Sequence, residues 1–119
     1  MNISSSFNRF YHSAVLAELF RKCGTLRFPL WVDTVTGAPL EFVKGEHFND
    51  VDDLKQIMKN MNLDYKLSDD ENGKISTKDI NVYDLMAHID YCIYIAGYNH
   101  IEFQFVRDEW ERLARQYEG

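Results

Sequence analysis

The predicted helix over Ile80–Ala96 is the feature that most constrains the fold, because it is apolar on two sides. One stripe along it suits a protein core, and it comprises Val82, Leu85, Met86, Ile89, Cys92, Ile93 and Ala96. A second stripe, roughly opposite, comprises Tyr83, Ala87, Tyr91, Tyr94 and Tyr98. Gly97 is expected to end the helix. A chain of 119 residues has few places to bury a helix completely, so the tyrosine side either packs under other elements or faces outward as an interface.

Three further segments are predicted to be helical. Ser4–Ser6 supply an N-cap for a helix over Phe7–Cys23, and the glycine that follows ends it. Either Asn49 or Asp50 caps a helix over Val51–Met61. Near the C-terminus, apolar residues recur every three or four positions, which predicts an amphipathic helix. The apolar faces of these helices comprise Val15, Leu16, Leu19, Phe20 and Cys23; Leu54, Ile57, Met58 and Met61; and Phe103, Val106, Trp110, Leu113, Ala114 and Tyr117.

A β-hairpin is predicted between the first two helices. Leu26–Val35 has the composition of a strand, Thr36–Gly37 that of a turn, and Leu40–Lys44 that of the returning strand. With a two-residue turn, Trp31 lies opposite Phe42. Both faces of this hairpin are then apolar, so other elements must cover each of them.

The segment between the second and third helices allows two interpretations. Ser68–Asp79 resembles the spacing of an EF-hand calcium loop, with Gly73 at the position of the sharp turn. Its two ends depart from that pattern, since a serine begins the loop and an aspartate replaces the final glutamate. A hairpin loop over Glu71–Gly73 explains the same residues with fewer exceptions, because it places Leu67 and Ile75 on one face. We therefore expect a second hairpin and no calcium.

Together these elements predict a single α+β domain over residues 1–119, with about four helices packed on a small antiparallel sheet made of two hairpins. No linker, repeat or low-complexity segment interrupts the chain. No run of about eighteen apolar residues is present, so no membrane contact is expected. The two cysteines are too few for a disulfide framework and, as free thiols, indicate a cytoplasmic protein.

Negative charge is concentrated in the middle of the chain. Residues 41–91 hold twelve acidic residues and six lysines, while acids and bases cancel elsewhere, so the middle carries the whole net charge of −6. An acidic chain disfavours direct binding of nucleic acid. The acidic middle is either a solvated face or a surface for a basic partner. The acidic candidates for such a contact are Asp52, Asp53, Asp69, Asp70 and Glu71.

No catalytic motif is recognisable in the sequence. His88 and Cys92 are four residues apart, which suits two ligands of one metal, but a structural zinc needs four and the remaining histidines and Cys23 are scattered singly. We therefore expect neither a metal nor a cofactor. A small enzyme whose site is assembled from dispersed residues stays an alternative, since titratable groups in a cleft are its usual sign. The residues to inspect for it are Asp33, His47, His88 and Asp90.

The tyrosine stripe is the best candidate for a functional surface, and its members are Tyr83, Tyr91, Tyr94 and Tyr98. Tyrosine provides a large contact area with a polar tip and is enriched at interfaces. The sequence thus favours a non-catalytic protein–protein interaction module, such as an inhibitor or adaptor. Its partner is another protein, including a basic nucleic-acid-binding protein whose site it occludes, or a second copy of the chain. An acidic dimeric secretion-type chaperone, with a long sheet edge or a helix groove for an extended client, is a further alternative.

Overall fold

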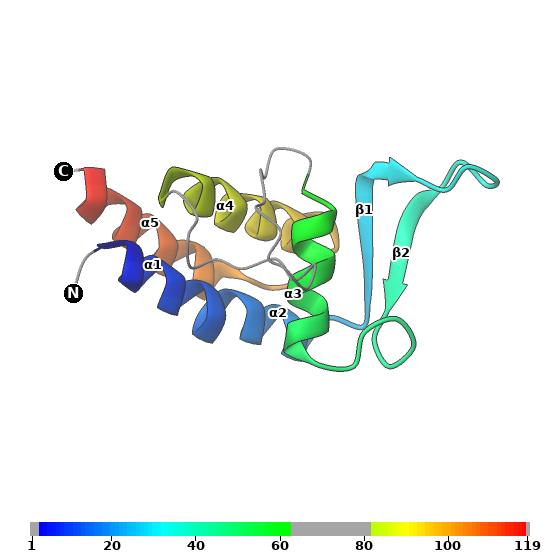
Figure 1. Ribbon diagram of the computed structural model, residues 1–119, viewed down its shortest axis with the longest axis horizontal. Helices are drawn as coiled ribbons and strands as arrows, with labels where there is room; N and C mark the ends of the chain where they lie inside the picture. The colour runs from blue at the N-terminus through cyan, green and yellow to red at the C-terminus, as the bar shows by residue number, and fades with distance from the viewer. Residues whose placement is uncertain (1–2, 63–81, 119) are drawn as a thin grey trace, which may run out of the picture.

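Four helices and one antiparallel hairpin make up residues 3–62 and 82–118, the part of the chain that the computed structural model describes (Figure 1). The first helix is continuous and consists of α1 (Ile3–Phe10), a π-helical segment η1 (Tyr11–Leu16) and α2 (Ala17–Lys22). The elements that follow it are β1 (Thr25–Val32), β2 (Pro39–Val43), α3 (Val51–Asn60), α4 (Val82–Tyr98) and α5 (Gln104–Glu118). This arrangement confirms the predicted α+β fold class.

Several predictions fall on residues outside the described ranges. They are the second hairpin around Glu71–Gly73, the calcium-loop alternative over Ser68–Asp79, and the acidic candidates Asp69, Asp70 and Glu71. The predicted start of the third helix, before Val82, belongs to the same group.

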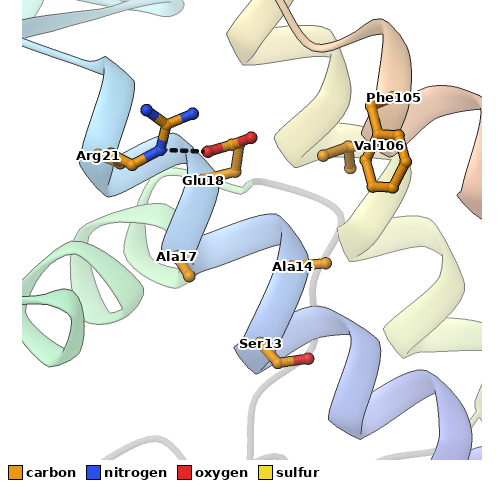
Figure 2. Close-up of a pocket in the computed structure, with 7 residues that line it drawn as sticks. All are labelled: Ser13, Ala14, Ala17, Glu18, Arg21, Phe105 and Val106. Atoms are coloured by element: carbon orange, nitrogen blue, oxygen red, sulfur yellow. Dashed lines mark hydrogen bonds and ion pairs between the residues drawn. The ribbon is translucent and has the colours of Figure 1, made fainter.

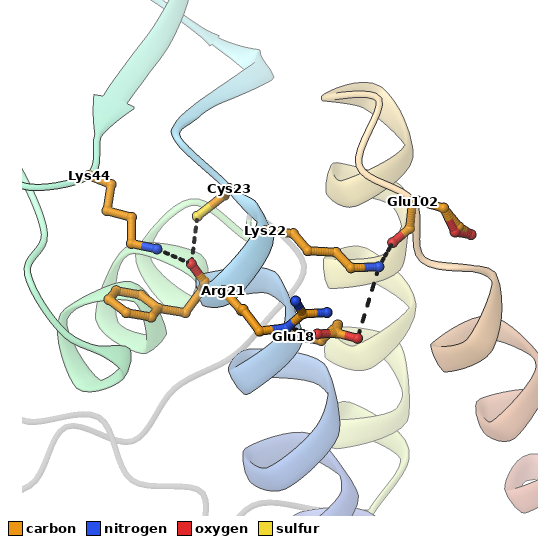
Figure 3. Close-up of polar contacts among 7 residues, drawn as sticks. Glu18, Arg21, Lys22, Cys23, Lys44 and Glu102 are labelled. Carbon is orange, nitrogen blue, oxygen red and sulfur yellow. Dashed lines mark hydrogen bonds and ion pairs between the residues drawn. The ribbon is translucent and has the colours of Figure 1, made fainter.

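The first helix begins earlier than the sequence predicts. Helical backbone already starts at Ile3, so Ser4–Ser6 lie inside the helix and are not its N-cap. At the other end the chain becomes extended at Cys23 (φ −82°, ψ 149°). There the Lys44 ammonium donates to the carbonyl oxygen of Phe20, which the Cys23 thiol also approaches (Figure 3). A lysine that follows β2 therefore caps the C-terminal end of this helix, and no left-handed glycine is involved.

The apolar helix faces predicted from the sequence meet in one buried cluster. Trp110 of α5 contacts two rings of the first helix, with ring centroids 5.1 Å from Phe7 and 5.9 Å from Phe10. The core stripe of α4 is also buried or partly buried, as predicted. The hairpin projects from one end of this helical layer (Figure 1). No helix in residues 3–62 or 82–118 is both long and apolar enough to cross a membrane.

The hairpin has a different register from the predicted one. Phe42 pairs with Leu26 and not with Trp31, so the pairing is displaced by five residues. The ladder breaks after Phe28 and resumes at Val32, and the residues between them bulge out of it. The first of these bulged residues is a proline, which has no N–H to donate to a ladder.

Asp33 organises the loop that accompanies this displacement. Its carboxylate Oδ1 accepts hydrogen bonds from the N–H groups of Thr36 (2.9 Å) and Val35 (2.8 Å), which form an Asx turn. These bonds hold the pKa of Asp33 below its ordinary value. Gly37, with a φ of 73°, donates to the Asp33 carbonyl, and the Asp33 N–H donates to the Ala38 carbonyl, both over 2.8 Å. The connection therefore spans residues 33–38, and the predicted two-residue turn is wrong.

Helix α3 begins at a predicted cap. Asp50 is extended, and its Oδ1 accepts a hydrogen bond from the Asp53 N–H over 2.8 Å. Asp53 Oδ2 in turn accepts from the Asn49 N–H over 3.0 Å. This exchange resembles a capping box, which satisfies amide groups that the first turn of a helix leaves unpaired. Leu54 and Met58 on the inner face are fully buried, as predicted.

Helix α4 continues through Gly97, which the sequence predicts as its end. His100 takes the left-handed conformation instead, with a φ of 58°. The N–H of Ile101 donates to the Ala96 carbonyl (2.9 Å) and that of His100 to the Gly97 carbonyl (3.1 Å), the two bonds of a Schellman cap. A β-carbon at Gly97 would lie 2.8 Å from Arg107 Nη2. The glycine thus permits the close approach of an α5 side chain, and its predicted role as a helix stop is wrong.

Replacing His100 with glycine is expected to stabilise the fold. A residue with a β-carbon is disfavoured in the left-handed region, so His100→Gly should raise the free energy of unfolding in urea by about 1 kcal/mol. His100→Ala keeps a β-carbon and serves as the control, with no gain expected. An equal gain in both variants would assign the effect to the imidazole and not to the backbone.

Candidate functional site

The tyrosine stripe predicted on α4 is largely exposed. Tyr83, Tyr94 and Tyr98 are 64%, 50% and 38% exposed. Tyr91 is half-buried: its hydroxyl donates to the Met61 carbonyl over 2.8 Å, and burial raises its pKa. Of the two alternatives that the sequence leaves open, the outward orientation therefore holds for three rings, and the fourth is anchored to the C-terminal end of α3.

Tyr91 and Tyr94 lie in the wall of a surface hollow that we call the tyrosine hollow. It has a volume of about 340 Å³. It is lined by Leu30, Asn62, Ala87, Asp90, Tyr91 and Tyr94. Leu30 comes from the bulge of β1 and is 60% exposed. The volume is at the low end for ligand pockets, which suits one or two side chains of a partner better than a large cofactor.

Two hydrogen bonds to one backbone oxygen position the walls of the hollow. The indole N–H of Trp31 (2.5 Å) and the hydroxyl of Tyr91 (2.8 Å) both donate to the Met61 carbonyl. Met61 directly follows α3, where a helix leaves carbonyl groups without intrahelical partners. The bond from Trp31 holds the bulge of β1 against α3, and this places the neighbouring Leu30 beside Tyr94.

The tyrosine hollow carries negative charge. Asp90 is its single carboxylate, and no lysine or arginine is found among the described residues that line it. Helix α4 itself contains two aspartates and no basic residue other than histidine. Asp90 Oδ1 accepts a hydrogen bond from the indole N–H of Trp110 over 2.8 Å, which orients the carboxylate.

The other two tyrosines of the stripe lie apart from the hollow. Tyr83 packs on Tyr117 of α5, with ring centroids 5.8 Å apart, and a hydrogen bond between them raises the pKa of Tyr117. Tyr98 borders a different hollow, together with Arg27. At a rise of 1.5 Å per residue, Tyr83 lies roughly 16 Å from Tyr94 along the helix axis. The stripe is therefore not one continuous site.

The acidic candidates Asp52 and Asp53 lie at the opposite end of α3 from the tyrosine hollow. They occupy the first turn of the helix, whereas Met61 follows its last turn, roughly 13 Å away along the axis. Asp53 also takes part in the capping of α3. The structure therefore places these two carboxylates on a separate surface and does not bring them to the tyrosines.

A buried polar cluster that the sequence does not predict lies where η1, α4 and the end of α3 meet. His88 is fully buried, and its Nε2 lies 2.9 Å from the Tyr11 hydroxyl. Asn62 Nδ2 donates to His88 Nδ1 over 2.8 Å, so a neutral ring carries its proton on Nε2. Burial, and then the charge of Lys59, lower the pKa of His88 to about 3. The ring is therefore uncharged at neutral pH.

Lys59 is a second buried titratable group near this cluster. Its side chain is 1% exposed. Burial, and then the charge of Lys55, lower the pKa of Lys59 to about 7. Such a lysine is partly uncharged at neutral pH, which reduces the cost of keeping it in the core. The charge of Lys59 also disfavours protonation of His88.

Cys92 completes a Cys–His–Asn arrangement with His88 and Asn62. Its Sγ lies 3.7 Å from His88 Nε2. The same residue types serve as nucleophile, base and orienting group in papain-like proteases. Here the thiol is fully enclosed, and burial raises its pKa. A protonated and enclosed thiol does not attack a substrate, so in the described conformation these contacts hold the core together.

The residues considered for a dispersed catalytic site are bonded to different parts of the fold. Asp33 organises the hairpin loop, and His47 Nδ1 accepts a hydrogen bond from the Val43 N–H over 2.8 Å. His88 is in the core, whereas Asp90 is exposed on α4. Within the described ranges, no three His, Cys, Asp or Glu side chains gather as a metal-binding group.

A second hollow lies between the first helix and the start of α5 (Figure 2). It is lined by Ser13, Ala14, Ala17, Glu18, Arg21, Phe105 and Val106. Phe105 is 76% exposed. The two charged residues, Glu18 and Arg21, pair with each other over 2.6 Å. This hollow is therefore apolar and electrically balanced, in contrast to the tyrosine hollow.

No protein-family model, curated protein or solved structure matches the chain. The chemistry of the side chains in the two hollows and the buried cluster is therefore the basis for inferring what the protein does.

The neutral state of His88 predicts an acid-labile fold. Its pKa is about 3 in the folded chain against an ordinary value of 6.5, so between these values the unfolded chain binds more protons. The free energy of unfolding should therefore fall as the pH is lowered through this window, and it should recover as the pH is raised. His88→Gln removes the titration and should flatten the dependence by roughly 1 kcal/mol per pH unit in urea denaturation. If the free energy of unfolding changed with pH in the same way in both proteins, a buried neutral His88 would be contradicted.

The enclosed Cys92 thiol should be unreactive in the native protein. In a Cys23→Ser variant, Cys92 is the single thiol, and its reaction with a chromogenic disulfide reagent should require unfolding. The same variant in urea provides the control for complete reaction. A native reaction rate close to that of free cysteine would instead favour Cys92 as an activated nucleophile.

Proposed function

We propose that the protein is a non-catalytic interaction module that binds a segment of another protein in the tyrosine hollow. The observation that supports this is the convergence of exposed apolar and aromatic side chains from separate elements, Leu30 of β1 and Tyr94 of α4, around one carboxylate. Exposed apolar side chains that gather in a concave site are typical of binding sites. The module acts as an inhibitor or adaptor.

The energetics of the hollow are adequate for specific binding. Tyr94 and Leu30 each expose half or more of their surface. Covering a large apolar side chain contributes on the order of 1–2 kcal/mol, and aromatic residues at the centre of an interface contribute most. Tyr91 adds a preorganised wall, because its hydroxyl is already held by the Met61 carbonyl.

The edges of the hairpin favour recognition by side chains over strand addition. The Arg27 N–H donates to Asn99 Oδ1 (2.8 Å), and Asn99 Nδ2 donates to the Arg27 carbonyl (3.0 Å). The next residue of β1 whose backbone points away from β2 is Pro29, which has no N–H. On β2, the Val43 N–H donates to His47. An extended chaperone client thus finds few backbone partners here, which favours the interaction module over the chaperone alternative.

The two thiols support the expected cytoplasmic location. Cys23 and Cys92 are both free and buried. Free buried thiols persist in a reducing compartment, where they act as small hydrophobic side chains.

Truncating Tyr94 should remove binding without unfolding the chain. Short random peptides displayed on phage, selected on the wild-type protein, should bind Tyr94→Ala about tenfold more weakly, because the variant loses an aromatic wall of the hollow. Its stability in urea should stay within roughly 0.5 kcal/mol of wild type, since the ring is half exposed.

Phe105→Ala is the matched control, because it removes an exposed aromatic ring outside the hollow. It should leave the affinity for the same peptides unchanged. Failure to enrich any peptide, or equal binding to both alanine variants and the wild type, would overturn the proposed function.

A further inference from the structure

We infer that the side chain taken up by the tyrosine hollow is an arginine, carried on an otherwise apolar segment of the partner protein. This inference rests on the proposed function and specifies its ligand. Three properties of the hollow support it: an oriented carboxylate, an exposed aromatic face, and an apolar wall in which no described residue is a lysine or arginine.

The carboxylate is Asp90. Its Oδ1 accepts the indole N–H of Trp110 over 2.8 Å, so the group is held in one orientation by a side chain of α5. Asp90 Oδ2 makes no hydrogen bond to any described residue, and Asp90 is exposed. A carboxylate oxygen that faces solvent beside a hollow is a suitable acceptor for a guanidinium N–H.

The aromatic face is Tyr94, whose ring lies at 40° to Tyr91 with centroids 6.4 Å apart. A guanidinium is planar and weakly hydrated, so it stacks on such a ring while it donates to a carboxylate, whereas a lysine ammonium stays hydrated as a point charge. Leu30 and Ala87 provide apolar surface for the methylene groups of the arginine stem.

Charge also argues against a second copy of the chain as the occupant. A two-fold interface through this face brings the Asp90 of both copies together, and α4 offers no lysine or arginine to compensate them. The net charge of −6 adds to the repulsion. A partner segment with positive charge is attracted by the same groups.

The test uses the phage-selected peptides with two aspartate variants of the full chain. Asp90→Asn keeps an oxygen to accept the Trp110 N–H but removes the charge, and it should weaken binding about tenfold. Asp84→Asn removes the same charge from α4 outside the hollow and should leave affinity unchanged. The selected peptides should be enriched in arginine, lose affinity when that arginine is replaced by lysine, and bind more weakly as salt is raised.

The possible results separate this inference from the proposed function. Peptides that need Tyr94 but lack arginine, tolerate lysine in its place, or bind Asp90→Asn as tightly as wild type overturn the inference and leave the proposed function standing. Peptides whose affinity is unchanged by Tyr94→Ala overturn both the inference and the proposed function. A dimer detected by light scattering and abolished by Tyr94→Ala would identify a second copy as the occupant and overturn the arginine assignment.

Discussion

The shared acceptor at Met61 is the interaction on which the arrangement of hairpin, α3 and α4 depends. Its carbonyl receives the Trp31 indole N–H and the Tyr91 hydroxyl, so three elements are joined at one oxygen. The carbonyl is available because Met61 lies just beyond the last turn of α3. Within residues 3–62 and 82–118, the bond from Trp31 is the polar tie between the bulge of β1 and the end of α3, and it helps to place Leu30 beside Tyr94.

A second constraint is the polar cluster inside the core. His88 has a partner at each ring nitrogen, Tyr11 at Nε2 and Asn62 at Nδ1, and these bonds satisfy a group whose burial would otherwise be costly. Tyr11 begins the π-helical segment of the first helix. Such a segment alters the direction of side chains along a helix and is often found at functional sites. Here it accompanies a contact that orders the interior beneath the exposed face of α4.

The core faces of the helices and the N-cap of α3 follow from local rules, which explains why these features are predictable. The two stripes of α4 require only the helical period, and the Asp50 cap requires only a short polar side chain before an apolar helix. The buried contacts of His88 are different, because its partners are distant in the sequence. Asn62 lies 26 residues before His88, and Tyr11 lies 77 residues before it. The sequence shows only the i,i+4 spacing of His88 and Cys92. In the structure this spacing corresponds to a buried contact between the two side chains.

What the sequence by itself determined is the set of helices, the presence of a hairpin, the fold class and the core side of α4, because periodicity is a property of neighbouring residues. Tertiary structure decided the strand register, the role of Gly97, and which tyrosines share a site. Two of these outcomes involve contacts between different elements: Trp31 leaves the ladder for the Met61 carbonyl, and the Arg107 guanidinium of α5 lies close to where a β-carbon at Gly97 would be. Local propensity favours a tight turn and a glycine stop, but long-range hydrogen bonds and packing favoured other solutions.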